Sequence, residues 1–344
     1  MKNTNGKPPV RQKAIHGGKG APSNCKNHNA EPGKKSGIQR MAQIYGTALA
    51  MGALVFASCS YGLDDFFSRR YTTEERITSI SASTQLATPS ATKTASTVTF
   101  AALSDLHFGG TLDRGKGRVE EQFLAWLTEQ KEAGTAPAFV LSLGDSADHG
   151  FGSEYEDYVA FTDKIDQILN DGNDAYTVYT VVGNHDLYNS GWGKWKEMVY
   201  PHISFYHFTT GTAQNNNQLS WYFLDSGSGS LGTNQYYALK DMMEADPLPK
   251  IISLHYPVYG DPAHLGGYFA LQNYYETTML LSLFSTERVR LVLDGHAHHY
   301  YHQDFGSYDE YNLPSVTASG QWALFTVDAT DGSILKFQMI YAER

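Results

Sequence analysis

Seven side chains that can ligate metals follow five short apolar runs in the chain. They are two carboxylates, one amide and four imidazoles: Asp105, His107, Asp145, Asn184, His255, His296 and His298. These hard oxygen and borderline nitrogen donors, without a thiolate, suit Mn, Fe or Zn and are poor ligands for a soft metal. Seven donors exceed the need of one tetrahedral ion. They fit two divalent ions about 3.5–4 Å apart that share a carboxylate. Such a pair of ions binds the oxygens of a phosphoryl group and lowers the pKa of a bound water.

The apolar runs before these residues are typical of β-strands. They cover residues 98–103, 138–143, 176–182, 251–254 and 289–294. Between the first three, residues 118–131 and 154–169 carry apolar residues at three- and four-residue steps, which predicts amphipathic helices. Parallel strands joined by crossover helices place their following loops at one edge of the sheet, so the polar clusters should converge. Candidate strands over 203–209, 219–225 and 323–327 and a helix over 235–244 predict a mixed sheet or two packed sheets there.

The ordered polar clusters resemble the signature of the calcineurin-like metallophosphoesterases. Five motifs match in order between residues 98 and 298: D-x-H from Asp105, G-D-x-x-D from Gly144, G-N-H-D from Gly183, the lone His255, and G-H-x-H from Gly295. One such tripeptide means little, but five in register are specific. The resemblance implies an α/β fold with two packed mixed β-sheets flanked by helices. It also implies metal-dependent hydrolysis of a phosphoric ester, either a phosphomonoester or a phosphodiester, with pyrophosphate left open.

The resemblance implies a role for each residue. One metal ion would be bound by Asp105, His107, Asp145 and His298, and the other by Asp145, Asn184, His255 and His296, so that Asp145 bridges the two. A metal-bound hydroxide would attack phosphorus in line. His185 would face the scissile phosphate and give a proton to the leaving oxygen, and Asp186 would orient the His185 ring.

Two subgroups of the family fit this sequence less well. A purple acid phosphatase is expected to have glycine in place of His107 and a tyrosine ligand in place of Asp148, and a serine/threonine protein phosphatase normally has arginine in place of Asp148. Asp148 itself either holds a ligand histidine or only caps the following loop. Trp192 and Trp195 form either an aromatic wall for the leaving group or the packing of a short helix, and Tyr256 has the same two interpretations.

The N-terminal part predicts export. Residues 1–40 are rich in Gly, Pro, Asn and Lys, which predicts a disordered basic leader. Residues 41–59 contain an uncharged run over 42–57, shorter than the roughly 20 residues of a membrane span, after three basic residues, as in a secretory signal. The run ends before Cys59 in a pattern that resembles a bacterial lipoprotein signal. Ordinary cleavage after Ala57 and an uncleaved short anchor remain alternatives.

The segments after Cys59 complete the predicted organisation. Residues 60–97 are expected to be a Ser/Thr-rich linker, and residues 98–344 the metallophosphoesterase domain. A lipid anchor on Cys59 would hold the exported protein at a bacterial membrane, in the periplasm or on the cell surface.

The charge distribution disfavours nucleic acid as a partner. Residues 61–344 carry 17 basic and 35 acidic residues, a net charge of −18, and nucleic-acid binding usually rests on clustered Lys and Arg. A small phosphate ester is therefore a better substrate than a long polyanion, which argues against a nuclease. A scaffold protein that keeps the fold without turnover is the rival of another class, but it would be expected to have lost ligands, and all seven are present. Two cysteines are too few for a disulfide framework.

Overall fold

The computed structural model describes residues 72–77, 84–110, 118–170, 176–260 and 269–343, and the structural statements below concern these residues. The chain divides into two units, residues 1–59 and 60–344, and every described residue lies in the second. The predicted leader, the predicted signal segment and Cys59 lie outside the described residues. None of the described helices has both the length and the apolar composition needed to cross a membrane.

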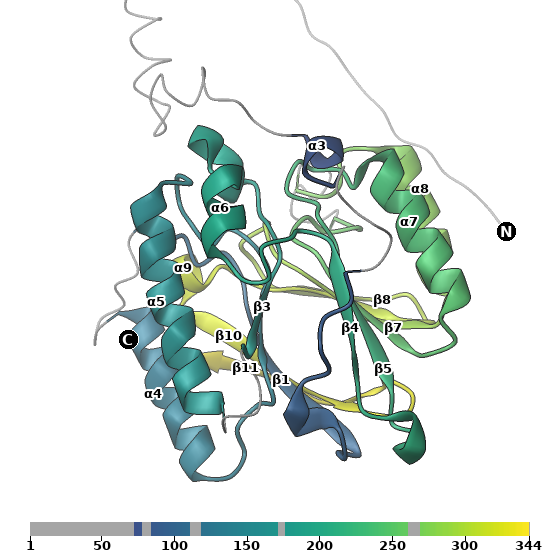
Figure 1. Ribbon diagram of the computed structural model, residues 1–344, viewed down its shortest axis with the longest axis horizontal. Coiled ribbons are helices and arrows are strands. Elements are labelled where there is room, and N and C mark those ends of the chain that lie inside the picture. Colours follow the sequence, from purple (N-terminus) through teal and green to yellow (C-terminus); the bar gives the residue numbers. More distant parts are fainter. Residues whose placement is uncertain (1–71, 78–83, 111–117, 171–175, 261–268, 344) are drawn as a thin grey trace, which may run out of the picture. The chain divides into compact units, whose positions relative to one another are not determined.

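Two mixed β-sheets pack face to face, and helices cover both outer faces, which confirms the expected fold class (Figure 1). The first sheet has the order β11-β10-β1-β2-β3. Its strands are β1 (Thr97–Leu103), β2 (Val140–Ser142), β3 (Val178–Thr180), β10 (Gln321–Asp328) and β11 (Ile334–Tyr341). The second sheet has the order β4-β5-β6-β7-β9-β8. Its strands are β4 (Tyr206–Thr210), β5 (Leu219–Phe223), β6 (Lys250–Ser253), β7 (Val289–Asp294), β8 (Tyr301–Asp304) and β9 (Asp309–Asn312).

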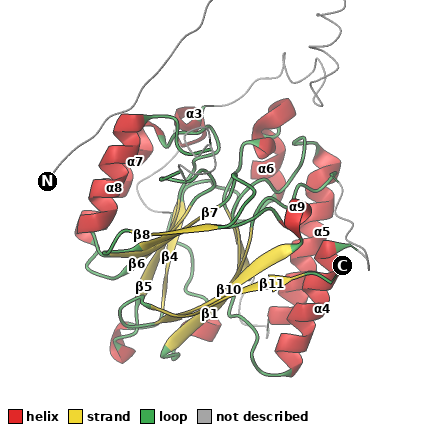
Figure 2. Ribbon diagram, turned by 180° about the vertical axis from the view of Figure 1, so that it is seen from behind, coloured by secondary structure: helices red, strands yellow, loops and turns green. Residues whose placement is uncertain are grey.

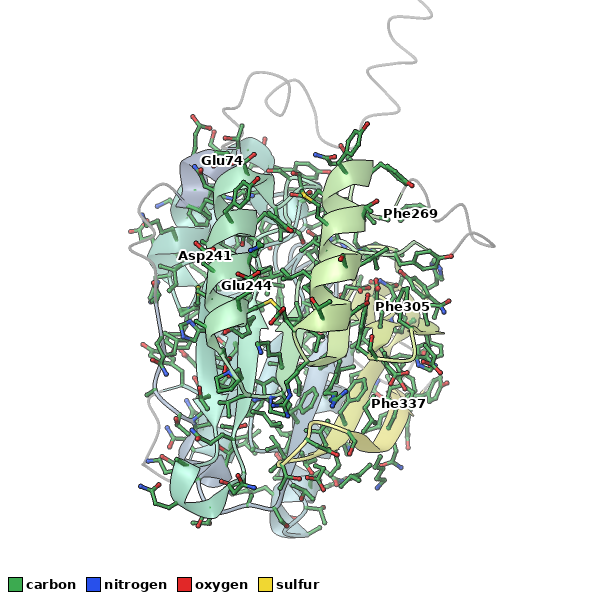
Figure 3. All side chains as sticks on the ribbon, turned by 90° about the vertical axis from the view of Figure 1, so that its right-hand side faces the viewer. Glu74, Asp241, Glu244, Phe269, Phe305 and Phe337 are labelled. Carbon is green, nitrogen blue, oxygen red and sulfur yellow. The ribbon has the colours of Figure 1, made fainter. Side chains whose placement is uncertain are left out.

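The helices form two layers outside the sheets (Figure 2). The layer on the first sheet contains α4 (Val119–Glu132), α5 (Gly152–Leu169) and α6 (Trp192–Met198). The layer on the second sheet contains α7 (Gly232–Ala245) and α8 (Tyr274–Thr286), which run side by side with Asp241 and Glu244 exposed on α7 (Figure 3). Two short helices, α3 (Thr73–Ile77) and α9 (Val316–Ser319), and the 3-10 turns η1 (Ser90–Thr92), η2 (His185–Ser190) and η3 (Ala213–Asn215) complete the described elements.

Alternating side chains of β1 show how the layers are held together. Phe100 and Ala102 lie in the core between the two sheets, whereas Ala101 and Leu103 pack under α4 and α5. Successive side chains of a strand point to opposite faces, so a strand buried on both faces must be apolar at nearly every position. The continuous apolar runs that end in polar clusters are therefore the central strands of the fold. Parallel pairing of β1 with β2 and of β2 with β3 brings their following loops to one edge.

The helices predicted over 118–131, 154–169 and 235–244 correspond to α4, α5 and α7, and every predicted strand has a counterpart. The sequence did not indicate α8 or the strands β8, β9 and β11. The sequences of β8 (YHQD) and β9 (DEYN) are largely polar, so they lack the apolar pattern that marks a strand.

Part of the predicted linker packs against the domain, where the structure differs from the expectation of a flexible tether. Arg76 of α3 is buried and binds the buried carboxylate of Asp225 through Nε (2.7 Å) and Nη2 (2.5 Å). Ile77 is buried in the apolar core between the second sheet and the helices that cover it. The backbone N–H of Leu86 donates to the carbonyl of His207 (2.8 Å). A segment rich in Ser and Thr can pack in this way because a few anchoring side chains, here Arg76 and Ile77, are enough. The boundary at residue 98 stays a prediction.

Candidate metal centre

The loops that follow β1, β2 and β7 hold their predicted ligands in an uncommon backbone conformation. Five of the seven residues have φ between +47° and +62°, namely Asp105, His107, Asp145, His296 and His298. This left-handed region is rare for residues with side chains and is concentrated at functional sites, where the surrounding structure stabilises it. Here the loops bind one another, because the His107 N–H donates to the carbonyl of Asp145 (2.9 Å) and the Gly295 N–H donates to that of His255 (3.0 Å).

Two motif glycines allow these loops to approach closely. A Cβ atom at Gly183 would collide with the backbone nitrogen and the carboxylate of Asp145, and one at Gly295 would collide with the hydroxyl of Ser104. Each glycine immediately precedes a predicted ligand. The G of G-N-H-D and the G of G-H-x-H are thus required for the ligands to meet.

The first predicted set of ligands comes together. Asp105, His107, Asp145 and His298 each offer one ligand atom, and all four atoms lie within 4.8 Å of one another. The Nε2 atom of His298 lies 3.2 Å from Oδ1 of Asp105 and 3.3 Å from Nε2 of His107. Three of these side chains are buried, and that of His298 is 42% exposed, so the cluster is open to solvent on the His298 side.

The second predicted set also converges, and it shares Asp145 with the first. Ligand atoms of Asp145, His255 and His296 lie within 4.8 Å of one another. Nε2 of His255 lies 3.4 Å from Oδ2 of Asp145 and 3.0 Å from Oδ1 of Asn184. Nδ1 of His255 donates to the carbonyl of Leu143 (2.8 Å), which turns Nε2 toward the cluster, as is usual for a ligand histidine.

The two carboxylates fit a metal pair. Oδ1 of Asp105 and Oδ2 of Asp145 are buried and accept no hydrogen bond from the described residues. Their other oxygens are occupied: Oδ2 of Asp105 accepts from the hydroxyl of Ser104 (2.5 Å) and the N–H of His296 (3.1 Å), and Oδ1 of Asp145 accepts from the N–H of His185 (2.8 Å). A buried carboxylate oxygen without a donor is unfavourable unless a cation binds it. With the imidazoles around them, these oxygens suit two divalent ions.

The charges of the site shift the histidine pKa values in opposite directions. Burial disfavours the charged form of His107 and of His255, but the carboxylates around them, chiefly Asp148 for His107 and Asp145 for His255, outweigh it and raise both pKa values to about 9. Burial and the neighbouring His255 lower the pKa of His296 to about 3. In the protein without metal, protons on His107 and His255 therefore compensate the two carboxylates.

The partner that orients His185 is Asp148, which corrects the role predicted for Asp186. Nδ1 of His185 lies 2.7 Å from the carbonyl oxygen of Asp148 and 3.6 Å from its Oδ1. Asp186 is fully buried, and its two oxygens accept from the backbone N–H groups of Ala147 (3.0 Å) and Gly183 (2.9 Å). Neighbouring side chains in a helical turn point in different directions, so Asp186 holds two loops together instead of the His185 ring.

Asp148 also approaches a ligand, which decides between its two interpretations. Its Oδ1 lies 3.2 Å from Nδ1 of His107, so it faces a ligand histidine instead of only capping the following loop. Burial lowers the pKa of His185, and the charge of Asp145 only partly opposes this. The imidazolium form of His185 is therefore disfavoured in the protein without metal.

The aromatic residues near the motifs divide into two groups. Trp192 and Trp195 stack on each other (5.5 Å between ring centroids) inside the core under α5 and α6, so they pack the helix. Tyr256, in contrast, stacks on His296 (3.8 Å). Sequence reasoning missed Tyr188, whose hydroxyl accepts from Nδ2 of Asn184 (3.2 Å) and whose ring lies 4.7 Å from that of His185. Its only sequence signal is its place two residues after the G-N-H-D motif.

A second row of polar residues supports the G-H-x-H loop from behind. Asp294, Glu310 and Asn312 are fully buried, and Nδ2 of Asn312 donates to Oδ1 of Asp294 (2.5 Å) and to the carbonyl of Gly295. Burial raises the pKa of Glu310 to about 7, and burial together with the charge of Glu310 raises that of Asp294 well above its usual value. One proton shared by the two carboxyl groups would account for both.

Comparison with known proteins agrees with this geometry. A model of the calcineurin-like phosphoesterase family matches residues 98–300. No curated protein sequence matches the chain. Among solved structures, a dimetal phosphatase from Danio rerio is 13% identical, with a TM-score of 0.50 over 72% of this chain and 99% of that one. GAP50, the anchor in the inner membrane complex of Plasmodium, is 12% identical, with a TM-score of 0.50 over 73% of this chain and 90% of that one. At these identities the likeness concerns the fold.

Proposed function

Because this chain belongs to the calcineurin-like phosphoesterase family and is a metal-dependent hydrolase, we propose that its two ligand clusters act together to hydrolyse a small phosphomonoester or phosphodiester by in-line displacement. The observation that carries the proposal is the position of Asp145. It belongs to both clusters and directs one buried oxygen, which accepts no hydrogen bond from the described residues, toward them. A shared carboxylate is what holds two ions close enough to act on one phosphoryl group.

The residues of the chain have distinct parts in this reaction. Two bound divalent ions would activate a water and neutralise charge on the phosphoryl oxygens. Asp105 and Asp145 are fixed by hydrogen bonds to one oxygen each, so their other oxygens are held in place before any ion binds. His185 is fixed through Nδ1, and since a carbonyl can only accept, Nδ1 carries its proton toward Asp148. Nε2 is then the atom that would give a proton to the leaving oxygen.

Metal removal and reconstitution test this proposal. Chelation of the purified chain should abolish hydrolysis of nitrophenyl phosphate and of a nitrophenyl phosphodiester, and Mn²⁺, Fe²⁺ or Zn²⁺ should restore one or both activities. Asp145→Ala should lose both metals and nearly all activity, because it deprives both sites at once. His302→Ala is the matched control, since His302 pairs with Asp309 (2.6 Å) away from the clusters. Full activity with one metal per chain, or after exhaustive chelation, would refute the two-metal proposal.

We also propose that the protein is exported and lipid-anchored at Cys59. Support comes from the basic residues Lys34, Lys35 and Arg40, the uncharged run over 42–57, and Cys59 two residues after it. In a bacterial host grown with labelled fatty acid, the chain should take up label, Cys59→Ala should not, and Cys25→Ala should label normally. A wild-type chain without label would refute the anchor and leave the hydrolase proposal untouched.

A further inference from the structure

A pocket of about 380 Å³ opens beside the second ligand cluster. Asn184 and Tyr256 line it on the metal side, where Oδ1 of Asn184 lies 3.0 Å from Nε2 of His255 and the Tyr256 ring stacks on His296. The described residues that complete the lining are Thr72, Leu187, Tyr188, Gly227, Ser228 and Gln272. The pocket therefore begins where a phosphoryl group held by the two clusters would end.

The far wall of this pocket is built and held in place. Gly227 brings its loop against the G-N-H-D loop, where a Cβ atom would lie 3.0 Å from the carbonyl of Gly183. The backbone N–H of Gln272 donates to the carbonyl of Gly229 (2.9 Å), and Arg76 of α3 donates to the hydroxyl of Ser228 (3.0 Å). The segment before the domain thus takes part in shaping the pocket.

The described part of the lining is polar and carries no charged side chain. Among the described residues that line the pocket, none has an ionisable acid or base at neutral pH, and hydroxyl or amide groups come from Tyr188, Ser228, Gln272 and Thr72. Arg76 lies behind Ser228, but the buried carboxylate of Asp225 binds it through two hydrogen bonds. A second phosphate placed against these described side chains would lose hydration without gaining a counter-charge from them, which is costly, and the nearby carboxylate of Glu75 already accepts two hydrogen bonds from Thr72. Neutral groups that donate and accept hydrogen bonds are matched.

The position of His185 connects the pocket to the leaving group. Its ring lies 4.7 Å from that of Tyr188, which lines the pocket. A leaving oxygen that takes a proton from His185 therefore has its carbon substituent next to Tyr188. From there the substituent extends toward Ser228 and Gln272.

We propose that the substrate is a phosphate ester of a neutral alcohol that carries several hydroxyl or amide groups, of monosaccharide or nucleoside size, and that this alcohol occupies the pocket. This inference rests on the proposed function. It names the class of leaving group, which the two ligand clusters by themselves leave open.

Binding of the free alcohol tests the pocket independently of turnover. Glucose, adenosine and choline are titrated calorimetrically into the metal-loaded full chain. Glucose or adenosine should bind in the millimolar range. Comparing the affinities of these two ligands tells whether the pocket prefers a sugar or a nucleoside. Choline should bind more weakly than the better of the two. Absence of binding by both glucose and adenosine, or tighter binding of choline, would overturn the proposal.

Removing one hydrogen-bonding group should affect only substrates that fill the pocket. Gln272→Leu keeps the size of the side chain and should weaken binding of the alcohol, and raise the KM of its phosphate ester, by a factor of about 2 to 12, the effect of one hydrogen bond. Hydrolysis of nitrophenyl phosphate, whose leaving group offers no hydroxyl or amide for this bond, should be affected less. Gln214→Leu, exposed in η3 at the other end of β5, is the matched control. Equal effects of the two variants would contradict the assignment.

A charge placed in the pocket gives a second test. Ser228→Lys should weaken binding of the neutral alcohol and favour substrates whose leaving group carries a second phosphate, such as pyrophosphate. Ser285→Lys adds the same charge on an exposed position at the end of α8 remote from Gln272 and should change neither. If nitrophenyl phosphate is hydrolysed but no alcohol binds, the pocket proposal fails and the hydrolase stands. If adenosine binds but no ester is cleaved, the proposed function fails instead.

Discussion

Replacing His185 by glutamine should separate substrates by their leaving groups. Nδ1 of His185 is held 2.7 Å from the carbonyl of Asp148, so the variant loses the Nε2 proton donor while its amide can still reach that carbonyl. A positioned proton donor contributes a factor of about 10² to 10⁴, or about 3 to 5 kcal/mol of transition-state stabilisation. The loss of kcat should have this size for an alkyl phosphate and be much smaller for nitrophenyl phosphate, whose leaving group departs without a proton.

The pH dependence gives an independent measurement of the same group. Burial lowers the pKa of His185 below its usual value, although the charge of Asp145 opposes this. The acid form is therefore lost as the pH rises through this lowered pKa. Hydrolysis of the alkyl ester should fall over that range and hydrolysis of the aryl ester should not, and the difference should vanish in His185→Gln.

Metal content and a control variant decide how the kinetic result is interpreted. His185→Gln should retain both metals, measured by atomic emission, and His302→Gln should behave as the wild type because His302 pairs with Asp309 outside the site. Equal losses on both esters would mean that His185 stabilises the phosphoryl oxygens instead of donating a proton. Loss of a metal would make it a ligand, and either result would refute the reasoning.

Two further predictions concern stability. Arg76→Leu leaves the carboxylate of Asp225 buried without its partner and should lower the free energy of unfolding in urea by about 3–5 kcal/mol, whereas adding Asp225→Leu should recover most of the loss. A small effect of the single change would mean that α3 does not pack on the domain in solution. For Glu310, a pKa raised from 4.5 to about 7 means that the folded state binds more protons, so the free energy of unfolding should fall between these pH values by up to about 3 kcal/mol. Glu310→Gln should remove that pH dependence, and an unchanged profile would contradict the raised pKa.

The strands and the ligand residues could be predicted because one sequence pattern, an apolar run followed by polar residues, marks both. A strand buried on both faces needs a continuous apolar run, and its end is marked by the first polar residues of the loop. In β1, β2 and β7 a ligand lies two or three residues beyond the end of the strand. Their convergence follows from the rule that loops after parallel strands lie at one edge of the sheet.

The remainder could not be predicted because it depends on contacts between distant segments. The resemblance implies that Asp186 orients His185, but the turn of η2 directs the two side chains apart and Asp148 orients the ring instead. The pocket beside Asn184 combines residues of separate loops and of the segment before α3, and apart from Asn184 itself they are not motif residues. The α3 segment itself looks like a tether in composition, and its anchors Arg76 and Ile77 show no pattern in the sequence that marks them as buried.

The buried carboxylates and histidines of the strained loops balance one another's charge before metals bind. Burial works against the charged forms of Asp105 and Asp145, but neighbouring histidines, among them His255, lower both pKa values. The same pairing raises the pKa values of His107 and His255 to about 9, so two negative and two positive charges are buried together without metal. An imidazole must be neutral to bind a metal, so each ion must displace a proton from its cluster. The carboxylates, already oriented by the left-handed loops, need not move when this exchange takes place. The loops that hold the ligands in this conformation therefore shape a site that protons occupy until metals replace them.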